Sequence, residues 1–191
     1  MIDSIFILGA VLAFTATNID DLFILTFFFS NKNFKESHII IGQYLGVFSL
    51  VLISSLGYFF KFIIPPSLLG LLGLIPIIIG IKELLKLRKH KEISEELNKE
   101  IKYNKSSIFK VSLVTISNGG DNIGIYMPLF ATISDYELLT VLFIFFLMIA
   151  IWCFISHSLV NHRFLSSKIE KYGHLIFPFV LIGIGIYVLL G

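Results

Sequence analysis

The chain is too apolar for a soluble protein. Hydrophobic residues make up 56% of its 191 residues and the mean hydropathy is +0.90, whereas soluble domains are roughly 45 to 50% apolar. A net charge of +2 gives no sign of a nucleic-acid partner, and a single cysteine excludes an intramolecular disulfide framework or a CxxC pair. The composition predicts an all-α integral membrane protein.

Apolar runs recur along the chain, and crossing a bilayer takes roughly 20 helical residues. We predict six transmembrane helices, at residues 4–29, 38–60, 66–87, 107–132, 137–160 and 173–190. Within the second of these, Gly42 and Gly46 are spaced as in closely packed helix pairs.

The basic residues support this count. Of the 15 Lys and Arg residues, fourteen lie on the connections after the first, third and fifth helices or on their flanks, and only Lys61 lies on the opposite side. Because cytoplasmic connections are enriched in Lys and Arg, this bias predicts that both termini are outside. The charged linker 88–106 is then cytoplasmic.

An internal repeat recurs at a separation of about one hundred residues. TATNIDDLFIL at 15–25 aligns with TISNGGDNIGI at 115–125, and IGIKELL at 79–85 is similar to IGIYVLL at 184–190. Residues 1–87 and 107–191 therefore form two predicted repeats joined by the linker 88–106. Since each repeat has three helices, the second is inverted relative to the first, as in many secondary transporters.

Three acidic residues fall at membrane depth: Asp20 and Asp21 in the first helix and Asp121 in the fourth. Each buried charge costs about 2.5 to 3.5 kcal/mol, and no Lys, Arg or His is predicted at the same depth. This cost favours an ion or proton site. Protonated carboxyls that hydrogen-bond between helices are the structural alternative.

The spacing predicts a cation site. Asn18 and Asp21 are three residues apart, as are Asn118 and Asp121, so each pair shares a helix face. If the repeats pack face to face, the four side chains offer oxygen ligands for a divalent cation. Hydroxyl ligands are available one turn away, at Thr15, Thr17, Thr115 and Ser117.

Neighbouring residues receive further predicted roles. Asp20 is expected in proton coupling or in support of the ligands, and Asn122 as a ligand or a helix contact. Gly119 and Gly120 weaken the helix and predict a broken turn that frees backbone carbonyls. Tyr126 and Gln43 line the pathway or join helices.

Cys153 and His157 are four residues apart on the fifth predicted helix. This spacing can bring a soft thiolate and an imidazole together at a cadmium or zinc ion. The structural alternative is a buried small hydrophobe and a solvated histidine.

The motifs TNIDDLFIL and SNGGDNIGIYMPLF resemble those of the CadD-type cadmium resistance transporters, small bacterial membrane proteins of the LysE superfamily. The resemblance covers essentially the whole chain. It implies cadmium efflux from a bacterial cell across the plasma membrane. The matching motif positions are Asn18, Asp20, Asp21, Asn118, Asp121 and Asn122.

We therefore expect a secondary exporter of a divalent metal, most consistent with cadmium, rather than an enzyme. Without a nucleotide motif, coupling to protons is favoured, since metal binding needs deprotonated carboxylates. No cofactor is expected. The predicted partners are the transported ion and the bilayer, and the oligomeric state stays open.

The same residues suggest two other functions. The first is an exporter of quaternary ammonium or other organic cations, with Tyr126 in an aromatic cage. The second is a diaspartyl intramembrane protease, which the Gly-Gly before Asp121 and the inverted repeat argue against.

Overall fold

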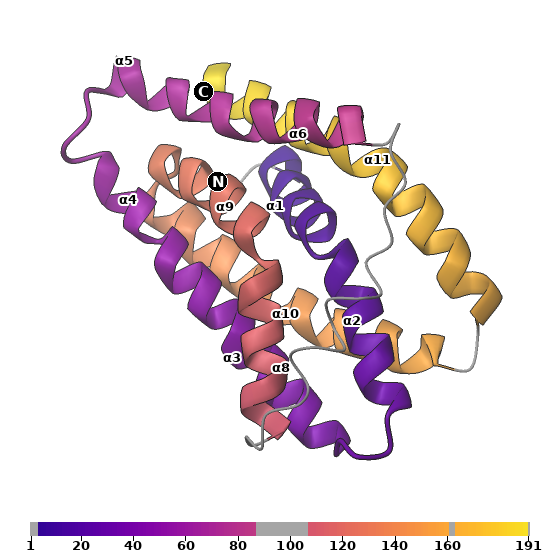
Figure 1. Ribbon diagram of the computed structural model, residues 1–191. Coiled ribbons are helices and arrows are strands. Elements are labelled where there is room, and N and C mark those ends of the chain that lie inside the picture. The colour runs from indigo at the N-terminus through magenta and orange to yellow at the C-terminus, as the bar shows by residue number, and fades with distance from the viewer. Residues whose placement is uncertain (1–3, 87–106, 161–162, 191) are drawn as a thin grey trace.

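The computed structural model describes residues 4–86, 107–160 and 163–190, and within these ranges every regular element is helical (Figure 1). The predicted linker 88–106 lies outside the described residues. In chain order the helices are α1 (Ser4–Thr17), α2 (Ile19–Ser30), α3 (Glu36–Ser54), α4 (Leu56–Phe60), α5 (Pro66–Leu69), the 3-10 helix η1 (Gly70–Gly73), α6 (Leu74–Lys86), α8 (Ser107–Asn118), α9 (Gly120–Thr132), α10 (Asp135–Leu159) and α11 (Arg163–Leu190).

Two segments are long and apolar enough to cross a membrane, Glu36–Phe60 and Asp135–Leu159, each of 25 residues. The pair α1 and α2 gives a third if it is counted as one span, although the two helices are bent by 55°. Two other predicted spans are divided into shorter helices: 66–87 into α5, η1 and α6, and 107–132 into α8 and α9. Within the described residues the fold is thus all-helical with two apolar spans, or three if the bent pair is one span, and six crossings stay a prediction.

The first predicted helix, 4–29, is not continuous, and this part of the prediction is wrong. It breaks at Asn18, where φ is −112° and ψ is 15°. Asn18 Nδ2 donates to the Phe14 carbonyl oxygen at 2.8 Å, so the side chain competes with the backbone for a helix acceptor. The break separates α1 from α2.

The fourth predicted helix, 107–132, breaks at Gly119, which lies between α8 and α9 with φ −84° and ψ 23°. The predicted loosening of this helix is confirmed. A side chain at Gly119 would place its Cβ 2.1 Å from Leu50 Cδ1, whereas Gly120 has no such neighbour within 4 Å. The two glycines therefore differ, and only at Gly119 would a side chain meet α3.

Helices α3 and α8 lie side by side (Figure 1) and approach closely at two glycines. A Cβ at Gly42 would lie 2.6 Å from Val111 Cβ, and one at Gly46 would lie 2.6 Å from Thr115 Cβ. Ser112 Oγ donates to the Gly42 carbonyl oxygen at 2.9 Å. The predicted role of Gly42 and Gly46 in helix packing is confirmed.

Helices α6 and α11 also pack along each other (Figure 1). A Cβ at Gly80 would meet Ile182 and the Pro178 carbonyl oxygen, both at 2.8 Å. A Cβ at Gly185 would meet Ile77 Cγ1 and the Gly73 carbonyl oxygen, both at 2.5 Å. Gly80 and Gly185 occupy equivalent positions in the two IGI motifs, and their contacts are reciprocal. Each glycine faces the residues that lie three and seven positions before the other glycine in the sequence.

An aromatic cluster forms the core between α1, α9 and α10. The Phe14 ring lies 5.3 Å from Phe145 and 5.5 Å from Trp152, centroid to centroid, and Tyr126 lies 4.6 Å from Phe145. All four side chains are buried. The cluster fixes the Asn18 break relative to α9 and α10.

Candidate ion site at the two helix breaks

Each break begins a helix that has aspartate in its first turn. Asp20 and Asp21 lie in the first turn of α2, and Asp121 lies in the first turn of α9. The N-terminus of a helix carries partial positive charge and free N–H groups, which stabilise a carboxylate. The two breaks therefore hold acidic side chains in equivalent settings.

Asp21 is 3% exposed and is held by two amides. Gln43 Nε2 donates to Oδ2 at 2.9 Å, and Asn118 Nδ2 donates to Oδ1 at 2.9 Å. Thr115 Oγ1 in turn donates to Gln43 Oε1 at 2.6 Å. Asp21 of one predicted repeat thus contacts Asn118 of the other directly.

A second cluster surrounds the hydroxyl of Tyr126. Asn18 Nδ2 donates to this oxygen at 2.8 Å, and Thr17 Oγ1 lies 2.7 Å from it. The Asn122 amide joins this cluster, since its Nδ2 donates to Asn18 Oδ1 at 3.2 Å and to the Tyr126 hydroxyl at 3.4 Å. Rotated by half a turn, that amide donates instead to the Thr17 carbonyl oxygen at 3.0 Å and to Asp121 Oδ1 at 3.1 Å.

The three carboxyl groups are close enough to interact electrostatically. Asp121 is half-buried, its Oδ1 accepts the Asn122 backbone N–H at 3.0 Å, and it interacts with both Asp20 and Asp21. The partners that hold Asp21 are neutral amides. A cation bound among these groups would relieve the repulsion between like charges.

Helix α10 supplies hydrogen-bond donors to backbone carbonyl oxygens at the Asn18 break. Trp152 Nε1 donates to the Asn18 carbonyl oxygen at 2.6 Å, and Ser156 Oγ donates to the Leu22 carbonyl oxygen at 3.1 Å. The sequence prediction did not include these two residues. The available signal was that Trp152 is the one tryptophan of the chain.

The remaining predicted residues are spread over different environments. Thr17 and Thr115 belong to the two clusters, Thr15 is half-buried one turn away, and Ser117 is exposed. Cys153 is buried in the core, at 4% exposure. His157 is exposed, and its Nε2 lies 3.3 Å from Glu36 Oε1.

Within the described part of the chain, no group of three or more His, Cys, Asp or Glu side chains could hold a metal ion by itself. A metal at the helix breaks would therefore need asparagine, threonine or backbone oxygens as well as Asp21 and Asp121. Such oxygen-rich sites suit hard cations better than soft ones.

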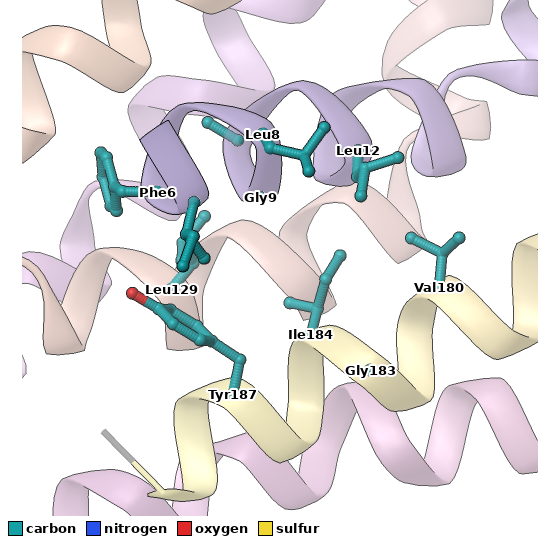
Figure 2. A pocket seen from close by; sticks show the side chains of 11 residues that line it. Phe6, Leu8, Gly9, Leu12, Leu129, Val180, Gly183, Ile184 and Tyr187 are labelled. Carbon is teal, nitrogen blue, oxygen red and sulfur yellow. The ribbon is translucent and has the colours of Figure 1, made fainter. Parts of the chain in front are cut away.

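An apolar groove of about 260 Å³ lies elsewhere, between α1, α9 and α11 (Figure 2). Phe6, Leu129, Ile184 and Tyr187 are among its lining residues, and the Tyr187 hydroxyl is the single polar side-chain group in that lining. The groove therefore lacks the set of oxygens that a metal ion needs.

Comparison with protein families decides the class of protein. The family model described as cadmium resistance transporter matches residues 14–191. The chain belongs to this family. The match includes both helix breaks and all four predicted ligand residues, and family membership indicates metal efflux by a multi-pass membrane protein. Comparisons with curated proteins and with solved structures give no match.

Proposed function

We propose that this cadmium resistance transporter exports cadmium from the cytoplasm and binds it at the two helix breaks. The ligands are Asn18, Asp21, Asn118 and Asp121. The observation that carries the proposal is the contact between Asn118 Nδ2 and Asp21 Oδ1 at 2.9 Å, which joins the two breaks. Two carboxylates neutralise the charge of a divalent ion and so offset much of the cost of burying it.

Binding requires a rearrangement of the amides. A cation needs the oxygen of an amide, whereas Asn118 and Asn18 turn their nitrogens toward Asp21 and Tyr126. Rotation of each amide by half a turn exchanges the donor for an acceptor. The rearrangement exchanges hydrogen bonds for metal–oxygen contacts and makes binding readily reversible, which suits an exporter.

The proposed transport cycle is alternating access by two inverted repeats. The reciprocal contacts of Gly80 and Gly185 support it. In a two-fold relation, if a residue of one repeat contacts a residue of the other, the two equivalent residues must also be in contact, and Gly80 and Gly185 follow this rule. The pairing of α3 with α9 and of α10 with α2 supports the same relation, because the alignment of the repeats makes α2 equivalent to α9 and α3 equivalent to α10. In this proposal six crossings place both termini outside the bacterial plasma membrane.

We propose protons as the coupling ion. Protons that enter from outside neutralise Asp21 and Asp121 and release the metal, and metal that binds from the cytoplasm displaces them. In this proposal Asp20 passes these protons, and its electrostatic interaction with both carboxyls supports that role. Asn122 connects Asp121 to the Asn18 cluster and supports the ligands.

A metal is favoured over an organic ammonium ion by the setting of Tyr126. Its side chain is fully buried and its ring stacks on Phe130 at 6.1 Å. Its hydroxyl is engaged by Thr17 and Asn18. An aromatic cage needs ring faces that are open to the cation.

The test is cadmium uptake into inverted membrane vesicles. Asp21→Asn and Asp121→Asn each remove a charged ligand, which we expect to cost at least about 3 kcal/mol, or roughly 100-fold in kcat/KM. Asp135→Asn at the start of α10 is the matched control and should retain transport. An acidic vesicle lumen should stimulate uptake, and a proton ionophore should abolish that stimulation. Uptake that survives in both site variants would rule out the two-carboxylate site.

A further inference from the structure

Gln43 connects the two halves of the candidate site, and its two ends bind different helices. It is 1% exposed on α3. Its Nε2 donates to Asp21 Oδ2 in α2 at 2.9 Å, and its Oε1 accepts from Thr115 Oγ1 in α8 at 2.6 Å. Thr115 is also 1% exposed, so both hydrogen bonds are shielded from solvent.

This arrangement fixes the orientation of the Gln43 amide. A half-turn would face Oε1 toward the carboxylate of Asp21, which is an acceptor, and would face Nε2 toward Thr115. The close approach of α3 and α8 keeps Thr115 in place, since its Cβ would lie 2.6 Å from a Cβ at Gly46. The Gln43 amide is therefore held in the orientation in which its nitrogen donates to Asp21.

Asn118 is the other amide donor to Asp21, and it is held less firmly. It is the last residue of α8, next to the break at Gly119, and it is half-buried. Its Nδ2 holds Oδ1 of Asp21 at 2.9 Å. When Asn118 turns its oxygen toward an ion, Oδ1 of Asp21 becomes free, whereas Oδ2 remains engaged by Gln43.

We propose that Gln43 is a specificity-determining residue that limits Asp21 to one oxygen ligand. The inference rests on the proposed cation site. Ca²⁺ takes six to eight oxygen ligands and often binds a carboxylate through both oxygens. With Oδ2 held by Gln43, the site offers Ca²⁺ one oxygen fewer, which reduces the advantage that an oxygen-rich site otherwise gives to a hard cation such as Ca²⁺ over cadmium.

The experiment measures cadmium transport by the full chain in proteoliposomes, with Ca²⁺ as the competitor. Gln43→Met keeps the approximate volume of the side chain and removes its donor. A hydrogen bond to a charged group is worth about 1.5 kcal/mol or more, so we expect Ca²⁺ to compete about tenfold better. The KM for cadmium should change less. The ratio of the Ca²⁺ inhibition constant to the cadmium KM should therefore fall.

Thr115 supplies an independent variant. Thr115→Val removes the hydroxyl that locks Gln43, which lets the amide turn its oxygen to the ion and should raise Ca²⁺ competition in the same direction. Thr115→Ser keeps the hydroxyl and should restore the wild-type ratio. Ser112→Ala is the matched control, because Ser112 is buried in the same helix pair but binds the Gly42 carbonyl oxygen.

The outcomes separate this inference from the proposed site. An unchanged ratio in Gln43→Met and Thr115→Val, with Asp21→Asn inactive, overturns the role of Gln43 and leaves the site intact. Transport that survives in Asp21→Asn overturns the site and this inference together. If Gln43→Met does not reach the membrane, the comparison of Thr115→Val with Thr115→Ser decides in the same way.

Discussion

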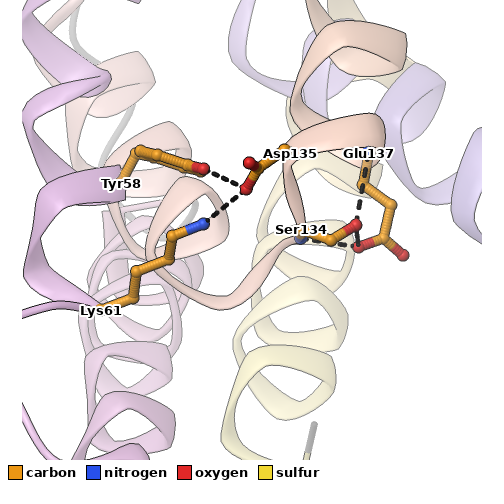
Figure 3. Close-up of polar contacts among 5 residues, drawn as sticks. All are labelled: Tyr58, Lys61, Ser134, Asp135 and Glu137. Carbon is orange, nitrogen blue, oxygen red and sulfur yellow. Dashed lines mark hydrogen bonds and ion pairs between the residues drawn. The ribbon is translucent and has the colours of Figure 1, made fainter.

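Lys61 Nζ lies 3.0 Å from Asp135 Oδ1 and joins the end of α4 to the start of α10 (Figure 3). Tyr58 donates to the same carboxylate oxygen, and the Lys61 ammonium lies 3.5 Å from the centroid of the Tyr58 ring. In the predicted topology this is the outer side, where Lys61 is the one basic residue. The contact links the two predicted repeats at a point remote from the ion site.

The first prediction concerns the pH response of this contact. Partial burial disfavours the charge of Lys61, but its interactions with Tyr58 and Asp135 outweigh that effect and raise its pKa. A raised pKa means that the contribution to stability is complete below the ordinary lysine value of about 10.4 and is lost as the pH rises through the folded-state value. The contact should therefore be constant between roughly pH 6 and 9.

Lys61→Met tests this prediction by thermal unfolding in detergent. We expect a melting temperature lower by a few degrees at most, because ion pairs at exposed carboxylates contribute little. The difference from the wild type should be the same throughout the neutral range and should shrink only at alkaline pH. A difference that grows or disappears near neutrality would contradict the assignment.

The second prediction distinguishes the two adjacent glycines of the Gly119 break. Gly119→Ala places a Cβ 2.1 Å from Leu50 Cδ1, whereas Gly120→Ala meets no atom within 4 Å. Overpacking of this kind costs about 1 to 3 kcal/mol. We expect Gly119→Ala to lower the melting temperature and cadmium uptake, and Gly120→Ala to leave both near the wild type.

A compensating change tests the cause. Leu50→Ala creates room for the new methyl group, so Gly119→Ala with Leu50→Ala should be more stable than the sum of the two single changes predicts. Additive effects would show that Gly119 is required for a reason other than its contact with α3.

Several features of the site could be predicted from sequence, for physical reasons. Asparagine and aspartate at membrane depth are costly, so their pairing at a spacing of three residues marked both halves of the candidate site. The glycines before Asp121 predicted the loosened α8–α9 junction. The break at Asn18 was missed because no glycine or proline precedes Asp20. At this break the Phe14 carbonyl oxygen accepts hydrogen bonds from both the side-chain amide and the backbone N–H of Asn18.

The contacts between helices could not be predicted in the same way. Gln43 and Trp152 lie on helices distant in sequence from Asp21 and Asn18, and helical periodicity does not fix which residues face each other across an interface. The spacing of Cys153 and His157 put them on one face of a helix. Nevertheless Cys153 is buried in the core, whereas His157, one turn later, is exposed beside Glu36.

The last prediction tests the two-fold relation between α6 and α11. Gly80→Ala and Gly185→Ala both force a Cβ against the facing helix, at 2.8 Å from the Pro178 carbonyl oxygen and 2.5 Å from the Gly73 carbonyl oxygen. Because these contacts are reciprocal, we expect the two variants to lower stability by similar amounts, about 1 to 3 kcal/mol each. Gly183→Ala is the matched control on α11, since its Cβ would meet no atom within 4 Å. Thermal unfolding of the three variants decides the matter: equal losses at Gly80 and Gly185 with none at Gly183 support the symmetry, and a loss at one of the pair alone contradicts it.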